Sequence, residues 1–329
     1  MQQPSDAPAI VLAKSVAASD VSTSTLLTDL TGPRIRLGAA ALDTHSDVVY
    51  SAPTGPDGQP RPLLLDIQVP RSAGRKPLVV HVTGGGFVFA EKSNGLTLRS
   101  YLAEAGFVVA SIQYRTVLDG ATFTDGVSDV KAAIRYLRAH GDQYGIDPER
   151  VGVWGESAGG YLVSMVGATT GLPQFEAGEH LEQSSAVLAV VDKFGLSDLA
   201  AVAADFDPAT QEHWNQPDTP LARYAGAGPG VAPRDAPRVN ARANPISYLD
   251  GGEPPFLILH GNADTIISPS QSLLLHTALR AAGASSTRYV LDGANHGDLE
   301  FLGDPDAGLP WSTEAVMDLI VGFLRDQLT

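Results

Sequence analysis

Residues 151–160 of the chain read VGVWGESAGG, and residues 161–166 continue with YLVSMV. The short apolar run predicts a buried strand, and the residues after Gly-x-Ser-x-Gly predict the start of a helix. This strand–turn–helix context is the one that a nucleophile elbow requires. Because the turn is sharp, the positions that flank the serine must be small, and Gly155 and Gly159 meet that demand. We therefore expect Ser157 to stand exposed at the carboxyl edge of a sheet, with a helix N-terminus pointing at the group that it attacks.

The composition is that of a globular protein with a sizeable core: 329 residues, 43% hydrophobic and 18% charged. The formal net charge of −15 argues against nucleic acid or an anionic membrane as a partner, since both would repel the chain. The sequence contains no cysteine, which excludes disulfides, thiolate metal sites and cysteine nucleophiles. No stretch reaches the roughly 18 apolar residues of a membrane span, so we expect no membrane insertion.

The N-terminal residues do not resemble a secretory leader. Residues 1–30 contain Lys14 as their only base and are rich in Ser, Thr, Ala and Asp. Because a leader could have been removed before this numbering begins, the sequence leaves open whether this soluble protein is cytoplasmic or secreted. It also leaves open whether the chain forms a homo-oligomer.

From residue 77 onward, apolar runs that predict strands alternate with helical patterns. Before that point, residues 47–51 and 63–69 predict an antiparallel hairpin. Besides the elbow strand, strands are expected at 77–82, 107–112, 187–191, 256–260 and 287–291. Helices are expected at 127–137, closed by Gly141, from a capping box at 268–271 to Gly283, and at 316–323. This alternation predicts an α/β fold with a mostly parallel sheet and helices on both faces.

Two segments fall outside the alternation. Residues 1–45, called the arm below, are rich in Ala, Ser and Thr, and we expect them to cover part of the site around Ser157. Residues 199–245, called the cap segment below, carry many prolines and glycines and are too long for a plain loop. We expect a cap insertion over the carboxyl edge of the sheet, within one domain that spans residues 46–329.

A serine hydroxyl is a poor nucleophile at neutral pH. A catalytic Ser157 therefore needs a base, a carboxylate that holds the base, and N–H donors for the oxyanion. Asp264 follows the strand at 256–260 and is the candidate acid, and His296 follows the last strand and is the candidate base. An aspartate before a helix is often only a cap, and a loop histidine is often a surface residue. The order Ser, Asp, His, with both partners after strands, nevertheless favours the catalytic interpretation.

Other carboxylates and histidines leave alternatives open. Asp192 and Asp198 are rival acids, because some hydrolases take the carboxylate from the preceding strand. Both otherwise fit capping or surface positions. The remaining histidines are expected to be structural or solvated, with the one in mid-strand a satisfied core residue. They are His45, His81 (the mid-strand one), His140, His180, His213, His260 and His276.

A glycine run supplies the candidate oxyanion hole. Gly84, Gly85 and Gly86 follow the strand at 77–82, and consecutive glycines let backbone N–H groups approach a substrate oxygen without obstruction by side chains. We assign the oxyanion hole to the N–H groups of Gly85, Gly86 and Ala158. A glycine run after a strand can also cradle phosphate, but no Gly-Lys-Ser/Thr follows this one.

Several motifs, in this order, resemble the α/β-hydrolase esterases. The resemblance covers roughly residues 47–327. Its nearest branches are the hormone-sensitive-lipase-like carboxylesterases and the related bacterial feruloyl and acetyl-xylan esterases. It rests on Asp264, His296 and these runs: GGGF at 84–87, QYR at 113–115, DPER at 147–150, GESAGG at 155–160, NPI at 244–246 and PPFLILHG at 254–261.

The resemblance implies an α/β-hydrolase fold and hydrolysis of carboxylic esters through an acyl-enzyme, with no cofactor and no metal. The family's roles carry over to the residues already singled out: Ser157, Asp264 and His296 as the triad, and Gly85, Gly86 and Ala158 as oxyanion donors. The chain departs from the family at Thr83, where the usual motif has a histidine that orients the glycine loop. The feruloyl esterase and tannase type that staples its triad with a disulfide is excluded by the lack of cysteine.

The substrate is expected to be a small-molecule ester. A proline-rich cap without a long apolar helix favours short-chain or aromatic acyl groups, feruloyl and acetyl among them, over long-chain lipids. Phe87 and Ile267 are expected to line the pocket. One alternative is an acyl-peptide or dipeptidyl-type peptidase, but such enzymes usually carry a propeller domain for which 329 residues leave no room. Another is a ligand-binding module without catalysis, which typically loses a triad member.

Overall fold

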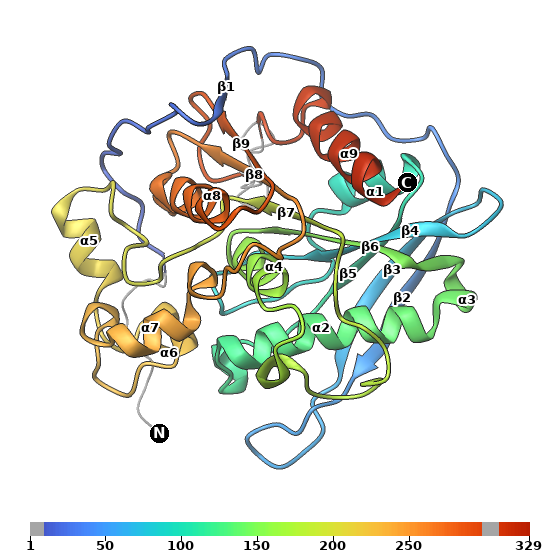
Figure 1. Cartoon of the computed structure of the whole chain (residues 1–329), viewed down its shortest axis with the longest axis horizontal. Coiled ribbons are helices and arrows are strands. Elements are labelled where there is room, and N and C mark those ends of the chain that lie inside the picture. The colour runs from blue at the N-terminus through green and yellow to red at the C-terminus, as the bar shows by residue number, and fades with distance from the viewer. Residues whose placement is uncertain (1–9, 298–308) are drawn as a thin grey trace.

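The computed structural model describes residues 10–297 and 309–329, and this part of the chain forms a nine-stranded sheet (Figure 1). The spatial order is β1-β9-β8-β7-β6-β4-β5-β3-β2. Neighbours pair in parallel, apart from β3, which runs antiparallel to both β5 and β2. The predicted α/β-hydrolase architecture with a mostly parallel sheet is confirmed. The strands are β1 (Thr25–Leu27), β2 (Leu42–Ser51), β3 (Leu63–Pro70), β4 (Lys76–Val82), β5 (Val108–Ile112), β6 (Ile146–Glu156), β7 (Ala189–Lys193), β8 (Phe256–Gly261) and β9 (Ser286–Leu291).

Helices cover both faces of the sheet because the side chains of each strand alternate between them. In β4, Val80 and Val82 join the core beneath α2, α4 and α8, whereas Val79 joins the core beneath α1 and α9. Figure 1 shows α9 and α2 on opposite sides of the sheet. No helix in the described ranges is both long and apolar enough to cross a membrane. These helices are α1 (Leu96–Glu104), α2 (Phe123–Ala139), α4 (Ala158–Ala168), α8 (Ser270–Ala282) and α9 (Glu314–Leu328).

The helix after β5 forms as its pattern predicts, but it is not closed by the predicted glycine. α2 stops at Ala139, and Gly141 does not close it but begins the short helix α3 (Gly141–Tyr144). The glycine that ends this second helix is Gly145, whose φ of 64° lies in the left-handed region. A glycine is required at the end of a helix only where the backbone takes the left-handed conformation, and Gly141 does not take it. The prediction that Gly141 closes the helix was therefore wrong.

The expected capping box at residues 268–271 does not form. Ser268 Oγ instead accepts the N–H of Asp205 at 2.7 Å. Gln271 also turns to a distant partner, and its Oε1 accepts the N–H of Asp198 at 2.8 Å. Tertiary hydrogen bonds therefore take the place of the local cap of α8. They join the start of this helix and the residues before it to the cap segment and to the residue that precedes it.

The cap segment folds into short helices that start with proline, the residue best suited to a first helical position. They lie together beyond one end of the sheet (Figure 1). Tyr224 of α6 stacks on Phe87, with ring centroids 4.4 Å apart, so the segment packs against the loop that holds the glycine run. The helices are α5 (Pro208–Trp214), α6 (Pro220–Ala225) and α7 (Pro237–Ala243).

The described part of the arm runs along the same side of the molecule. The N–H of Ala13 donates to the carbonyl of Thr265 at 2.8 Å, in the loop after β8. Ala17 N–H donates to Asp205 O, also at 2.8 Å, in the cap segment. Further along, β1 pairs in parallel with β9 and becomes the edge strand of the sheet.

Candidate active site

Ser157 occupies a strained turn between β6 and α4. Its φ of 55° and ψ of −121° are unfavourable for a residue with a side chain, and such strain is typical of a nucleophile elbow. A Cβ atom on Gly155 would collide with the carbonyl of Gly159, and one on Gly159 would collide with the carbonyl of Val82. Both glycines are therefore required for the turn to close. The serine is half-buried, so it is less accessible than the exposed position that the sequence predicts.

Asp264 and His296 form a buried pair at the ends of β8 and β9. Asp264 Oδ2 lies 2.8 Å from His296 Nδ1, and Asp264 Oδ1 accepts the N–H groups of Ile266 and Ile267 at 2.8 and 2.9 Å. Burial alone would raise the pKa of the Asp264 carboxyl, but the charge of His296 and hydrogen bonds from His260 and His296 hold it well below its ordinary value. With Nδ1–H donated to a carboxylate, Nε2 is the ring nitrogen that can take a proton.

The loops that carry this pair are joined to each other. Asn295 Oδ1 accepts the N–H and the hydroxyl of Thr265 at 3.0 and 3.1 Å, and also the N–H of His296 at 2.7 Å. Gly261, at the end of β8, leaves no room for a Cβ atom because the carbonyl of Ala294 lies against it. These contacts fix the loop that carries Asp264 and the loop that carries His296 relative to each other.

Strand β7 lies between β6, which leads to Ser157, and β8, which leads to Asp264, and it contacts both sides of the candidate site. Ser157 N–H donates at 2.9 Å to the carbonyl of Lys193, the last residue of β7. The next residue, Phe194, has its ring centroid 4.5 Å from that of His296. Because β6, β7, β8 and β9 are consecutive parallel strands, their carboxyl ends place all three candidate residues at one edge of the sheet.

The glycine run lies directly against the nucleophile. A Cβ atom on Gly84 would lie 3.1 Å from the Cβ of Ser157. Gly85 and Gly86 have φ values of 144° and 60°, which only glycine adopts without strain. In the described part of the chain, the backbone N–H groups of Gly85, Gly86 and Ala158 donate no hydrogen bond to a backbone carbonyl outside helices and strands. These three donors are therefore available to a substrate oxygen.

Thr83 does not replace the family's histidine with a hydrogen bond of its own. It is fully buried, and its hydroxyl has no partner in the described part of the chain. The hydroxyl of Tyr114 takes over and donates to the Thr83 carbonyl at 3.0 Å. The start of the glycine loop is thus fixed by a tyrosine from the segment after β5.

The two residues expected to line the pocket are both buried. Phe87, 3% exposed, is stacked on Tyr224 and meets Tyr161 edge-on, with centroids 5.5 Å apart. Ile267, also 3% exposed, contributes its backbone N–H to Asp264. Their contact with substrate stays a prediction.

The rival acids have other partners. Asp198 lies just before the cap segment, and its Oδ1 accepts a hydrogen bond at 3.1 Å from the side-chain amide of Asn244 in that segment. Asp192 is fully buried at the end of β7, where Oδ1 accepts the N–H of Gly195 at 2.8 Å and Oδ2 lies 3.1 Å from Ser164 Oγ. Neither set of partners includes a histidine, so Asp264 is the better placed acid.

Burial raises the pKa of Asp192 to about 7 against two hydrogen bonds that lower it, and this makes stability depend on pH. Between about pH 4 and pH 7 the Asp192 carboxyl keeps a proton in the folded protein that it has lost in the unfolded chain, so the contribution of Asp192 to stability falls as the pH rises through this range. We expect Asp192→Asn to remove the decline, because asparagine can accept from Gly195 and donate to Ser164. At pH 8 the variant should be more stable by up to about 4 kcal/mol.

Urea unfolding followed by circular dichroism at pH 5 and pH 8 measures this effect. Asp326→Asn removes the same charge from an exposed position and should leave the pH dependence as it is. An unchanged slope in Asp192→Asn would mean that Asp192 is ionised throughout.

One residue next to the candidate triad was not singled out from the sequence. His260, grouped with the structural histidines, places Nε2 3.1 Å from Asp264 Oδ2. The signal was its position at the end of a strand, four residues before the candidate acid. His81, in contrast, lies in the core as expected, with its ring nitrogens on Ser111 and Glu156.

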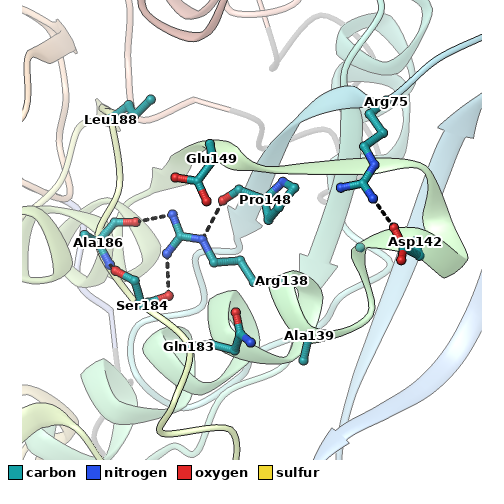
Figure 2. A pocket seen from close by; sticks show the side chains of 11 residues that line it. Arg75, Arg138, Ala139, Asp142, Pro148, Glu149, Gln183, Ser184, Ala186 and Leu188 are labelled. Atoms are coloured by element: carbon teal, nitrogen blue, oxygen red, sulfur yellow. Dashed lines mark hydrogen bonds and ion pairs between the residues drawn. The ribbon is translucent and has the colours of Figure 1, made fainter.

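The cavity in Figure 2 lies elsewhere. It has a volume of about 480 Å³, and its lining includes Pro148 and Glu149, in the first half of β6, whose far end leads to Ser157. Arg138 points into it but already donates to the carbonyls of Pro148 and Ala186. This cavity is therefore not the substrate site. Across residues 10–297 and 309–329, no cluster of three or more His, Cys, Asp or Glu side chains could hold a metal.

Comparisons with known proteins agree on one group. The sequence model of the BD-FAE family matches residues 65–279. Esterase LipC of Mycobacterium tuberculosis is 32% identical over 243 residues, which cover 71% of this chain and 56% of that protein. For Esterase LipQ of the same organism the identity is 30% over 277 residues, covering 82% and 60%. This chain thus spans a little over half the length of these curated relatives.

A solved structure extends the likeness to the whole fold. The structure of a truncated carbohydrate esterase from gut microbiota superposes with a TM-score of 0.73 at 27% identity. The match covers 90% of this chain and 99% of that one.

Proposed function

Since the chain belongs to the BD-FAE family, we propose that it is a serine carboxylesterase that works through an acyl-enzyme. The observation that carries the proposal is the buried Asp264–His296 pair at the same sheet edge as the strained Ser157. A base oriented by a carboxylate, a nucleophile held in an elbow and free N–H donors beside it are the parts that acyl transfer needs.

In the proposed reaction, the Ser157 hydroxyl attacks the ester carbonyl carbon while His296 Nε2 takes the hydroxyl proton. The charge that develops on the carbonyl oxygen is stabilised by the N–H groups of Gly85, Gly86 and Ala158. His296 then gives its proton to the leaving alcohol. A water molecule repeats the sequence on the acyl-enzyme, which releases the acid and restores Ser157.

We propose small-molecule esters with short or aromatic acyl groups, acetyl and feruloyl among them, as substrates. The cap segment supports this choice, because its helices are short and begin with proline rather than forming one long apolar helix. The arm supports this choice too. A Cβ atom on Gly86 would lie 3.7 Å from Ile10 Cδ1, so the Ile10 side chain occupies part of the space in front of the glycine loop. The structural neighbour named as a carbohydrate esterase is consistent with acetyl esters of sugars.

Hydrolysis of p-nitrophenyl esters from acetate to laurate tests this proposal. We expect kcat/KM to fall with acyl length and to be at least about tenfold lower for laurate than for acetate, a difference of about 1.4 kcal/mol. A fluorophosphonate should label one serine per chain, and the labelled protein, which serves as the control, should be inactive. A preference for laurate would overturn the assignment of short acyl groups. Absence of both turnover and labelling would overturn the esterase assignment.

A further inference from the structure

The Asp264 carboxylate has more partners than His296 and the backbone. Its Oδ1 is saturated by the N–H groups of Ile266 and Ile267, and its Oδ2 is shared by two imidazole rings. The second ring is that of His260, whose Nε2 lies 3.1 Å from Oδ2. His260 is fully buried at the end of β8, on the strand that leads directly to the acid.

The surroundings of His260 determine which nitrogen carries its proton. Nε2 also lies 3.1 Å from the carbonyl oxygen of Ile267, so both atoms near it are acceptors and Nε2 must be the donor. Nδ1 is buried and has no partner among the residues that the structure describes. A second proton on Nδ1 would be a buried donor without an acceptor, which is costly. The geometry therefore places the proton of the neutral His260 ring on Nε2.

We propose that His260 is a positioning residue, which fixes the Asp264 carboxylate by donating Nε2–H to the same oxygen that binds His296. The proposal rests on the proposed function, in which Asp264 orients the catalytic base. A carboxylate held from both sides cannot rotate, so the direction of the Asp264–His296 hydrogen bond is set before substrate arrives. Sharing Oδ2 also lowers the negative charge available to a protonated His296, which favours release of its proton to the leaving group.

Two substitutions separate positioning from packing. His260→Phe keeps a ring of similar size but removes the donor, and we expect kcat per active site to fall about 10- to 100-fold with KM changed less than about threefold, as for other groups that orient catalytic ligands. His260→Gln keeps an N–H at the position of Nε2 and should recover kcat to within about threefold of the native value. The acid limb of the pH profile of kcat/KM should move to higher pH in His260→Phe and stay in place in His260→Gln.

His276→Phe is the matched control. His276 is another buried histidine with both ring nitrogens engaged, by Ser286 Oγ at 2.9 Å and the Thr23 carbonyl at 3.1 Å, but it does not touch Asp264. Active sites are counted by fluorophosphonate labelling, so that loss of folded protein does not count as loss of kcat. Equal losses in His260→Phe and His260→Gln, or a kcat per site in His260→Phe that matches His276→Phe, would overturn the proposal.

A measurement on the native protein keeps the proposal testable where a variant fails to fold or the native chain hydrolyses no ester. In a protein labelled with ¹⁵N-histidine, the signal of His260 should show a proton on Nε2. The signal is assigned as the one lost in a His260 variant or, if none folds, through its contacts to Ile267. A ring that carries its proton on Nδ1 and none on Nε2 would overturn the proposal. Lack of ester hydrolysis with the expected tautomer would count against the proposed function alone.

Discussion

Replacing Ser157 with alanine is expected to lower kcat for p-nitrophenyl acetate by roughly 10⁶-fold, the loss seen when the nucleophile of a serine hydrolase is removed. The alanine has no oxygen to acylate, so only the glycine loop and the binding site remain to accelerate attack by water. Labelling by a fluorophosphonate should disappear at the same time. The fold should persist, because the Ser157 contacts that the structure shows are made by its backbone, to Lys193 and Tyr161.

Ser164→Ala is the control for this experiment. Ser164 lies two turns along α4, is fully buried, and reaches only Asp192 with its hydroxyl. It should keep labelling and turnover within a few-fold of the native protein. Residual turnover in Ser157→Ala above a few per cent would place the nucleophile elsewhere.

The elbow could be predicted from sequence because its constraints are local. Gly155, Ser157 and Gly159 lie within five residues of each other, and the collisions that exclude larger side chains involve that turn and the strand beside it. The alternation of buried strands and amphipathic helices is local in the same sense. It predicted the fold class, although it placed the strand at 187–191 two residues before β7 (Ala189–Lys193).

The predicted position of β7 was two residues too early because the strand ends in polar residues. Asp192 and Lys193 are fully buried, and Lys193 lies 3.8 Å from Glu156, the residue before the nucleophile. Burial alone would raise the pKa of Glu156, but the contact with His81 and the charges of Lys193 and Arg99 hold it below its ordinary value. A hydropathy pattern treats such residues as exposed, so a buried ionic cluster beneath the elbow has no sequence signal of its own.

Long-range hydrogen bonds explain the other contacts that the sequence did not predict. Ser268 and Gln271 are the residue types of a capping box, but their side chains accept hydrogen bonds from Asp205 in the cap segment and from Asp198 just before it. The hydroxyl of Tyr114, in the segment after β5, donates to the carbonyl of Thr83. Each of these pairings depends on which loops meet at the sheet edge, and that is decided by the strand order rather than by neighbouring residues.

Asp264→Asn is expected to lower kcat by roughly 10⁴-fold while the protein stays folded, because the amide reverses the hydrogen bond that orients the base. The carbonyl oxygen of the new amide must face the N–H groups of Ile266 and Ile267, since the NH₂ group cannot accept from them. The NH₂ group then faces His296 Nδ1 and forces that nitrogen to accept. His296 would carry its proton on Nε2, and a protonated Nε2 cannot take the proton of Ser157.

His260 adds a second unfavourable contact to the Asp264→Asn variant. Its Nε2–H donates to Asp264 Oδ2 in the native protein and would meet a second donor in the variant, so neither orientation of the asparagine satisfies all its neighbours. We expect this conflict to appear as a loss in kcat with little change in KM, measured with p-nitrophenyl acetate and normalised to folded protein. Asp192→Asn neutralises a carboxyl at the end of the neighbouring strand and serves as the control, with kcat within a few-fold of the native protein. Should Asp192→Asn lose activity and Asp264→Asn keep it, the acid of the triad would be the one on β7, and the pairing of Asp264 with His296 would be structural.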